Sequence, residues 1–408
     1  MYNSARRKAD NRQLRRLPFI ASAIAPGKAA SKNQSVLPVL TLEQYLETIA
    51  DFEIQYSQFL DPEGNASPDM PELARNTDEL LNMYRHMTET RVFDTKAVNL
   101  QRTGKLGTYA SCLGHEATHV GLAAAMHEDD VLAPSYREYG AMFYRGVRMS
   151  EVLLYWGGDE RGSDFQGPKK DFPFCVPIST QTLHAAGAAM AFQLRGESRC
   201  AVSINGDGGT SEGAFYEAMN IAGARKLPVV FVVVNNKWAI SVPIELQTAS
   251  KTLAQKSVAA GIPGIQVDGN DVIAVRYWVE RALARGRKGD GATLIEAVTY
   301  RLSDHTTADD ASRYRKKEEV EAARKLEPLI RMRKYLTSLG LWDDDKEKEL
   351  LEQAAGKVDQ AVQQYLNTPK APVESMFDYM YAELPEFLEE QREHAMHYGR
   401  SSDGDGHG

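Results

Sequence analysis

The sequence predicts an α/β fold in which helices cover both faces of a parallel β-sheet. From about residue 200 onward, short runs rich in β-branched residues alternate with segments whose apolar residues have helical spacing. The run at 229–234 contains no polar residue, which is typical of a strand covered on both faces. Glycine and polar residues follow two neighbouring runs, at the position where open parallel sheets bind ligands.

The predicted elements follow one another in a simple order. Strands are placed at 200–204, 229–234, 265–267 and 293–298, and the helices between them at 211–224 and 272–285. Because strand, helix and next strand form right-handed crossover units, the strands are expected to be parallel. Before this region, helical spacing at 40–59 and 77–101 predicts an N-terminal helical extension.

These patterns divide the chain into five parts. They are a flexible basic arm (1–35), a helical extension (36–100), the α/β domain (101–315), peripheral C-terminal helices (316–398) and a disordered tail (399–408). The first 33 residues carry eight Lys or Arg side chains and one acid, without the apolar core of a secretory signal. We interpret this arm as part of a cytoplasmic bacterial protein, with a transit segment to the mitochondrial matrix as the alternative.

The composition excludes several classes of function. The 408 residues, 43% of them apolar, are sufficient for a large core. A net charge of −8 provides no basic field for nucleic acid, and no run of 18 apolar residues could span a bilayer, so neither is an expected partner. Three cysteines without CxxC spacing predict a reducing compartment, with no disulfide framework and no structural zinc.

Two polar motifs stand directly after neighbouring predicted strands. Gly206-Asp207-Gly208-Gly209 follows the first, and Asn235-Asn236 follows the next. Adjacent strand ends can bring Asp207 and Asn236 together, and their oxygens are the ligands that Mg²⁺ prefers. The glycines let the backbone approach phosphates closely. A loop turn would explain Gly-Asp-Gly alone but not the matching Asn pair, and neither a P-loop nor a G-x-G-x-x-G motif is present. The sequence therefore predicts a diphosphate–metal site.

These motifs resemble those of the alpha subunits of the thiamine-diphosphate-dependent, decarboxylating component of 2-oxo-acid dehydrogenase complexes. The resemblance runs from about residue 80 to 385, through segments 107–111, 136–140, 206–217, 235–241, 267–271 and 305–315. It implies the thiamine-diphosphate-binding fold, of which this chain would supply the diphosphate-binding domain. It also implies an oxidoreductase that acts on the oxo group of a 2-oxo acid.

The resemblance implies roles for individual residues. Asp207 and Asn236 would bind Mg²⁺ through their side chains, and Trp238 through its carbonyl. The cofactor would contact Tyr136, Arg137, Val176, Ile178, Asp207, Gly208, Gly209, Asn236, Trp238 and His305. Pro177, Thr180 and Gln181 resemble a potassium-binding turn of branched-chain members.

His305 is the expected catalytic residue of this chain. It lies in a polar loop after the strand at 293–298, where a packed core histidine is not expected. The matching histidine of the family touches the cofactor diphosphate and assists acyl transfer to a lipoyl group, which suits a proton donor near neutral pH. Thr306 stands where animal relatives carry a regulatory serine, so phosphorylation control is in doubt.

The resemblance also implies partners. The glutamate that activates the cofactor belongs to a second domain in the family, and this chain has no stretch that resembles it. We therefore expect a beta subunit to supply it, in a heterotetramer of two alpha and two beta chains. The alpha chain alone should be inactive. The acyl group would pass to the lipoyl group of a partner acyltransferase.

The substrate is left open between alternatives. Segments 107–110 and 248–269 resemble bacterial pyruvate dehydrogenase alpha subunits, whereas 177–181 and 305–310 are closer to branched-chain enzymes. One methylene-sized change in a pocket is worth only about 1–3 kcal/mol, so a few residues decide the choice. We expect pyruvate first, 3-methyl-2-oxobutanoate second and acetoin third.

One motif favours a different class of protein. His115, Glu116 and His119 match H-E-x-x-H, the signature in which zinc proteases bind their metal, and Glu138 could be a further ligand. Only three positions are fixed, so chance matches are common. The motif also falls where the resembled family has a Gly-x-Glu-Ala helix start without metal. Zinc proteolysis is therefore a remote alternative.

Overall fold

The computed structural model describes residues 47–399, and the predicted basic arm (1–35) lies outside them, as does residue 400 onward of the predicted tail. Contacts divide the chain into two units, 1–51 and 52–408, and the fold given below is that of the second unit. No helix within 47–399 is long and apolar enough to cross a membrane.

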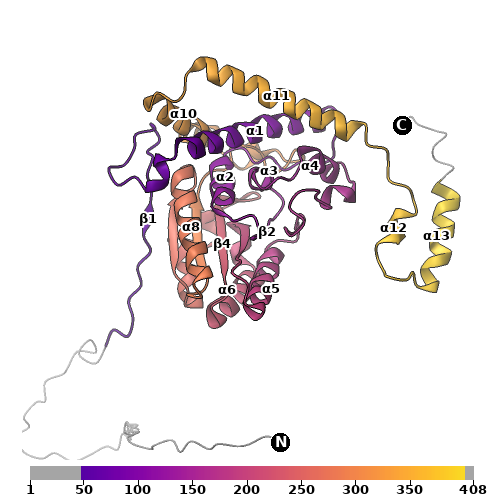
Figure 1. Ribbon diagram of the computed structural model, residues 1–408, viewed down its shortest axis with the longest axis horizontal. Helices are drawn as coiled ribbons and strands as arrows, with labels where there is room; N and C mark the ends of the chain where they lie inside the picture. The colour runs from indigo at the N-terminus through magenta and orange to yellow at the C-terminus, as the bar shows by residue number, and fades with distance from the viewer. Residues whose placement is uncertain (1–46, 400–408) are drawn as a thin grey trace, which may run out of the picture. The chain divides into compact units, whose positions relative to one another are not determined.

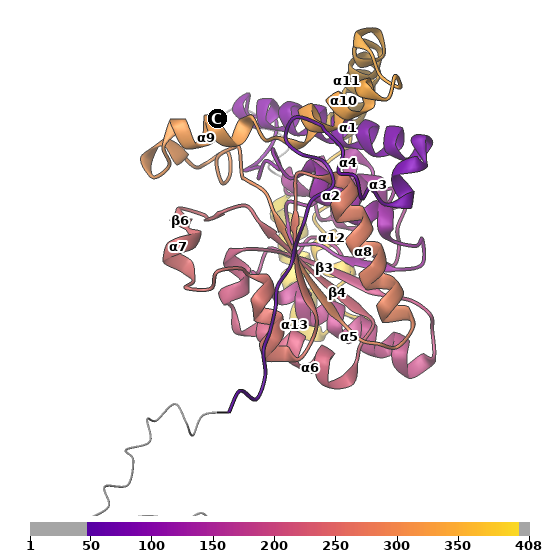
Figure 2. The same ribbon diagram turned by 90° about the vertical axis from the view of Figure 1, so that its left-hand side faces the viewer.

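The second unit is built on a six-stranded parallel sheet (Figures 1 and 2). Its strands are β1 (Tyr56–Ser57), β2 (Val131–Ala133), β3 (Ala201–Gly206), β4 (Val229–Asn235), β7 (Gly264–Asp268) and β8 (Thr293–Val298). Their order across the sheet is β1-β7-β8-β4-β3-β2, and every pairing is parallel. The four predicted strands are confirmed to within two residues at each end. A separate antiparallel pair joins β5 (Trp238–Ala239) to β6 (Val242–Pro243).

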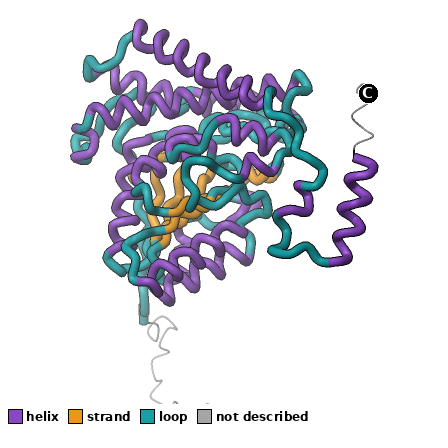
Figure 3. The backbone as a smooth tube through the Cα atoms, turned by 45° about the vertical axis from the view of Figure 1, so that its right-hand side comes forward, coloured by secondary structure: helices purple, strands orange, loops and turns teal. Residues whose placement is uncertain are grey.

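Helices cover both faces of this sheet, as predicted (Figure 3). Val230, Val232 and Val234 of β4 pack into a core with α1 (Thr77–Arg102), α2 (Glu116–Ala125), α3 (Tyr139–Tyr144), α4 (Met149–Trp156) and α8 (Val272–Arg287). The alternate residues Val229, Phe231 and Val233 pack against α5 (Thr180–Arg195) and α6 (Gly213–Arg225). Every residue of β4 is buried because successive side chains of a strand point to opposite faces, and both faces are covered.

The remaining helices are shorter or lie outside these two layers. They are α7 (Ile244–Gln247), α9 (Lys317–Arg324), α10 (Pro328–Ser338), α11 (Asp344–Leu366), α12 (Ser375–Asp378) and α13 (Glu386–Gly399), with the 3-10 helices η2 (Glu72–Arg75), η3 (Glu160–Ser163), η4 (Gly208–Ser211), η5 (Ala254–Ala260) and η6 (Ala311–Arg313). The long helix α11 packs along α1 (Figure 1).

The helix predicted at 40–59 is wrong over the part that the structure describes. Residues 47–59 contain no helix, and β1 lies there at the edge of the sheet. The amide of Gln266 donates to the Gln55 carbonyl, and the amides of Phe59 and Leu60 donate to the buried Asp271 carboxylate at 2.6 and 2.7 Å. These long-range hydrogen bonds outweigh the local helical spacing. The helix predicted at 77–101 is confirmed as α1, which begins after an Asn76 cap.

Candidate active site

A cavity of about 600 Å³ lies at the carboxyl ends of β3, β4 and β8, and we call it the strand-end cavity. All ten residues predicted to contact the cofactor line it: Tyr136, Arg137, Val176, Ile178, Asp207, Gly208, Gly209, Asn236, Trp238 and His305. They come from segments far apart in the sequence, and the parallel sheet brings them to one edge. This edge is where open α/β sheets bind ligands.

Asp207 and Asn236 lie at the ends of adjacent strands, because Gly206 of β3 pairs with Val234 of β4. One carboxylate oxygen of Asp207, Oδ1, accepts the Gly208 amide at 3.0 Å. The other, Oδ2, is buried and has no hydrogen-bond partner among the described residues. Burial raises the pKa of Asp207 to about 6, so its charge needs a compensating cation. This unpartnered oxygen fits a Mg²⁺ ligand.

The glycine turn after β3 is closely packed. A Cβ atom at Gly209 would lie 2.1 Å from the Asn205 side-chain oxygen, and one at Gly208 would lie 2.8 Å from the Cβ of Ala239. Neither position can accept a side chain without movement of its neighbours. The turn therefore presents backbone to the cavity, as a phosphate cradle requires.

Arg137 and His305 are in direct contact. The buried Arg137 guanidinium donates to the carbonyls of Ser111 and His305, and its Nη2 lies 3.2 Å from His305 Nδ1. Since a guanidinium can only donate, Nδ1 accepts and a neutral His305 carries its proton on Nε2. Burial and the positive charge of Arg137 lower the pKa of His305 to about 4. An anion bound beside Arg137 would offset part of this lowering.

Arg301 is a residue of the cavity that sequence reasoning missed. It is the third residue after β8 and is 1% exposed. Its guanidinium donates to the Trp238 carbonyl at 3.2 Å, to the Ile240 carbonyl at 2.8 Å and to the Tyr314 hydroxyl. Among residues 47–399, neither Arg301 nor Arg137 forms an ion pair with a carboxylate. Two buried cations without a carboxylate partner favour an anionic ligand. The signal in the sequence was a basic residue three positions after a predicted strand.

The comparisons with known proteins agree with this geometry. Residues 84–374 match the family model described as "Dehydrogenase E1 component". The chain is 43% identical over 347 residues to the 3-methyl-2-oxobutanoate dehydrogenase subunit alpha of Mycobacterium tuberculosis, covering 84% of this chain and 93% of the relative. It is 40% identical over 351 residues to the pyruvate dehydrogenase E1 component subunit alpha of Staphylococcus aureus, covering 85% of this chain and 94% of the relative.

The chain belongs to the dehydrogenase E1 family. It is the alpha subunit of a thiamine-diphosphate-dependent 2-oxo-acid dehydrogenase, an oxidoreductase, as the sequence motifs indicated. An alpha subunit of an E1 component implies a beta subunit with which it forms a complex.

The predicted potassium turn of this E1 chain does not line the strand-end cavity through Pro177, Thr180 or Gln181. Gln181 is fully buried, its amide nitrogen donates to the Ile204 carbonyl at 2.7 Å, and its Oε1 has no partner within 47–399. Ser179, between these residues, has a left-handed backbone with φ 68°. The turn is therefore tight and contains a free acceptor, and its K⁺ role stays a prediction.

The side chains of the H-E-x-x-H segment are buried, and its glutamate is hydrogen-bonded within the protein. The Glu116 carboxylate accepts Arg91 at 2.5 Å and the Gly114 amide at 2.9 Å, so it is not free to activate water. His115 and His119 are buried, and only His115 lines the cavity. No group of three His, Cys, Asp or Glu side chains in the described part of the chain is placed to hold a metal. The protease interpretation has no support here.

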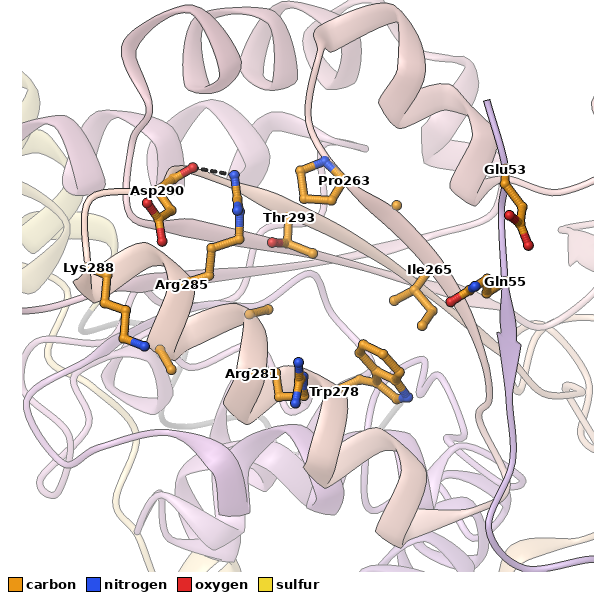
Figure 4. Close-up of a pocket in the computed structure, with 13 residues that line it drawn as sticks. Glu53, Gln55, Pro263, Ile265, Trp278, Arg281, Arg285, Lys288, Asp290 and Thr293 are labelled. Carbon is orange, nitrogen blue, oxygen red and sulfur yellow. Dashed lines mark hydrogen bonds between the residues drawn. The ribbon is translucent and has the colours of Figure 1, made fainter. Parts of the chain in front are cut away.

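A second cavity, of about 650 Å³, lies at the opposite end of the sheet (Figure 4). It is bordered by Gly264 and Thr293 at the starts of β7 and β8, by Trp278 and Arg285 of α8, and by Gln55. None of the predicted site residues lines it. The amino ends of parallel strands are not where such sheets bind cofactors, so the strand-end cavity is the candidate active site.

The buried His119 predicts an acid-sensitive fold. Burial lowers the pKa of His119 from 6.5 to about 3, so at intermediate pH the unfolded chain binds a proton that the folded chain excludes. Its contribution is complete above pH 6.5 and is lost as the pH falls. Below pH 6.5, the free energy of unfolding should fall less steeply with decreasing pH in His119→Leu than in the unaltered chain. The expected difference in slope is about 1.4 kcal/mol per pH unit.

Urea unfolding of the full-length chain at several pH values measures this slope. The exposed His127, changed to leucine, is the matched control and should leave the slope unchanged. Equal slopes for His119→Leu and the unaltered chain would contradict the prediction.

Proposed function

We propose that this chain is the alpha subunit of a pyruvate dehydrogenase, which decarboxylates pyruvate oxidatively and passes the acetyl group to the lipoyl group of a partner acyltransferase. The strand-end cavity supports the cofactor part of this proposal, because a free carboxylate oxygen of Asp207, the cations Arg137 and Arg301, and His305 face one space. A metal–diphosphate group needs an oxygen ligand for the metal and cationic side chains for the diphosphate. The choice of pyruvate rests on segments 107–110 and 248–269, which resemble bacterial pyruvate dehydrogenase alpha subunits.

The roles of the side chains follow from their positions. Asp207, Asn236 and the Trp238 carbonyl would hold Mg²⁺, the amides of Gly208 and Gly209 would receive the diphosphate, and Arg137 would pair with it. Tyr136, Val176 and Ile178 would contact the rest of the cofactor. Pro177, Thr180 and Gln181 would bind K⁺. Thiamine diphosphate, when bound, supplies the ring that accepts the electrons left by departing carbon dioxide.

His305 would hold a proton at Nε2 for the acyl-transfer step. Its Nδ1 is fixed by Arg137 at 3.2 Å, so the ring cannot turn freely and Nε2 keeps one direction. A donor of this kind typically contributes 10²–10⁴-fold to a proton-transfer step. The lipoyl group would approach from the open side of the cavity.

The proposal includes a beta subunit that completes the site in a heterotetramer of two alpha and two beta chains. Around the cavity, Val176, Ile178 and Ile240 are exposed by 48%, 45% and 58%, more than apolar side chains of a finished site would be. The glutamate needed for cofactor activation would come from that subunit. We also propose the division of the chain into the five parts given above, with boundaries at residues 36, 101, 316 and 399.

We also place the protein in the bacterial cytoplasm. Both relatives named above are bacterial, and they give no support to the mitochondrial alternative. All three cysteines are free thiols, which suits a reducing compartment.

A second candidate substrate is the branched 3-methyl-2-oxobutanoate, because the Mycobacterium tuberculosis relative carries that name. The test is to express the chain with its beta subunit and measure kcat/KM for pyruvate, the branched acid and acetoin. We expect pyruvate to be preferred by about tenfold or more, the scale of one or two methylene contacts. The chain without its beta subunit should show no turnover.

A hundredfold preference for the branched acid would reverse the order of the two candidates. Normal turnover by the isolated alpha chain would contradict the shared site.

A further inference from the structure

Lys256 is a buried lysine without a carboxylate partner. It lies in η5 and is 7% exposed. Its ammonium donates to the Thr210 carbonyl at 2.7 Å and to the Thr210 hydroxyl at 3.0 Å, and it lies 5.3 Å from the centre of the Tyr216 ring. Within 47–399, no acidic group lies within ion-pair distance of it. Lysine is almost never buried unless it is paired, so this charge needs an explanation.

The two hydrogen bonds connect Lys256 to the predicted metal ligand. The Thr210 hydroxyl donates to the Asp207 carbonyl at 2.7 Å, and Gln247 donates to the same carbonyl at 2.5 Å. Because an ammonium only donates, it fixes the Thr210 hydroxyl as its acceptor and directs the hydroxyl proton toward Asp207. Lys256 thus contacts the turn at Thr210 of η4, and the Thr210 hydroxyl connects it to Asp207, which precedes η4.

We propose that Lys256 is a positioning residue for the cofactor diphosphate and its metal, acting through the η4 turn. It holds Asp207, Gly208 and Gly209 in place. Its positive charge lies behind the turn, and the negative charge of the bound diphosphate would compensate it. The inference rests on the proposed function of the strand-end cavity. Lys256 should therefore matter more for cofactor binding than for the stability of the cofactor-free protein. The reason is that an unpaired buried charge itself opposes folding.

The test uses the full-length chain expressed with its beta subunit, in four variants: Lys256→Met, Lys256→Gln, Lys256→Arg and the exposed control Lys251→Met. Calorimetry with thiamine diphosphate and Mg²⁺ gives Kd, and urea unfolding without cofactor gives stability. We expect Lys256→Met and Lys256→Gln to raise Kd tenfold or more without lowering the unfolding midpoint. Lys256→Arg should stay within threefold of the unaltered protein, and Lys251→Met should be unchanged. At saturating cofactor, kcat of Lys256→Gln should fall less than threefold.

The outcomes separate this inference from the function on which it rests. An unaltered protein that does not bind thiamine diphosphate removes the proposed function of the cavity. An unaltered protein that binds it, with Lys256→Gln binding equally well, overturns the role of Lys256. Loss of stability in the cofactor-free variants with unchanged Kd also overturns it, because that is the result of a purely structural contact. If Lys256→Met does not fold, the Gln and Arg variants decide.

Discussion

Replacing Asp207 with asparagine will remove cofactor-dependent activity, with kcat/KM falling on the order of a thousandfold or more. Asp207 provides the carboxylate oxygen that lies buried and without a partner at the end of β3. Asparagine keeps the shape but removes the charge that a Mg²⁺ ion needs. Calorimetric titration with thiamine diphosphate and Mg²⁺ should detect no binding at millimolar concentrations.

The same substitution should leave the cofactor-free protein at least as stable as the unaltered one. A buried, unpaired charge opposes folding, so its removal costs nothing in the empty cavity. Asp290→Asn is the matched control, because Asp290 is exposed and its hydrogen bonds to Arg285 use its backbone amide and carbonyl, not its carboxylate. Retained cofactor affinity in Asp207→Asn would rule out Asp207 as a metal ligand.

Replacing His305 with glutamine will separate the two halves of the reaction. We expect acyl transfer to a lipoyl domain to fall by about 10²–10⁴-fold, the usual contribution of a positioned proton donor. Decarboxylation measured with an artificial electron acceptor should fall less than tenfold, because that half does not use the proton. Stopped-flow measurements of both halves on the reconstituted complex test the split.

The pH dependence of acyl transfer provides a second measurement for His305. Without a bound anion its pKa is lowered to about 4 by burial and by Arg137, and a diphosphate beside Arg137 should raise it. If His305 donates as the imidazolium, the transfer rate falls as pH rises through this raised pKa, because the neutral ring keeps its Nε2 proton but is a far weaker acid. An NMR titration of the ring with and without thiamine diphosphate measures the shift. An unchanged pKa, or equal losses in both halves of the reaction, would contradict the assigned role.

Much of the fold and the site was readable from local patterns. The run at 229–234 identified β4 because a strand covered on both faces needs no polar alternation. Asp207 and Asn236 could be placed together because each directly follows a strand and parallel strands end at the same edge. The resemblance to the family assigned Arg137 and His305 to the same cofactor site, and both line the cavity. In each case the information lies within a few residues of the element that positions the side chain.

Other features were decided only by the tertiary structure. Arg137 and His305 are 168 positions apart, and their contact depends on how two loops meet above the sheet. The segment that became β1 has helical spacing, but Asp271 and Gln266 supply hydrogen bonds that no neighbouring residue could offer. Arg301 and Lys256 are both buried without an acidic partner among the described residues, Arg301 in the lining of the cavity and Lys256 behind the η4 turn.

The sequence by itself therefore determined the family, the parallel sheet and the strand ends that carry the polar motifs. Only the tertiary structure decided which cations are buried at that edge and which of them lack a counter-charge. The physical reason is that hydrophobic spacing and turn chemistry act over a few residues, whereas burial and charge pairing depend on groups that are distant in the chain.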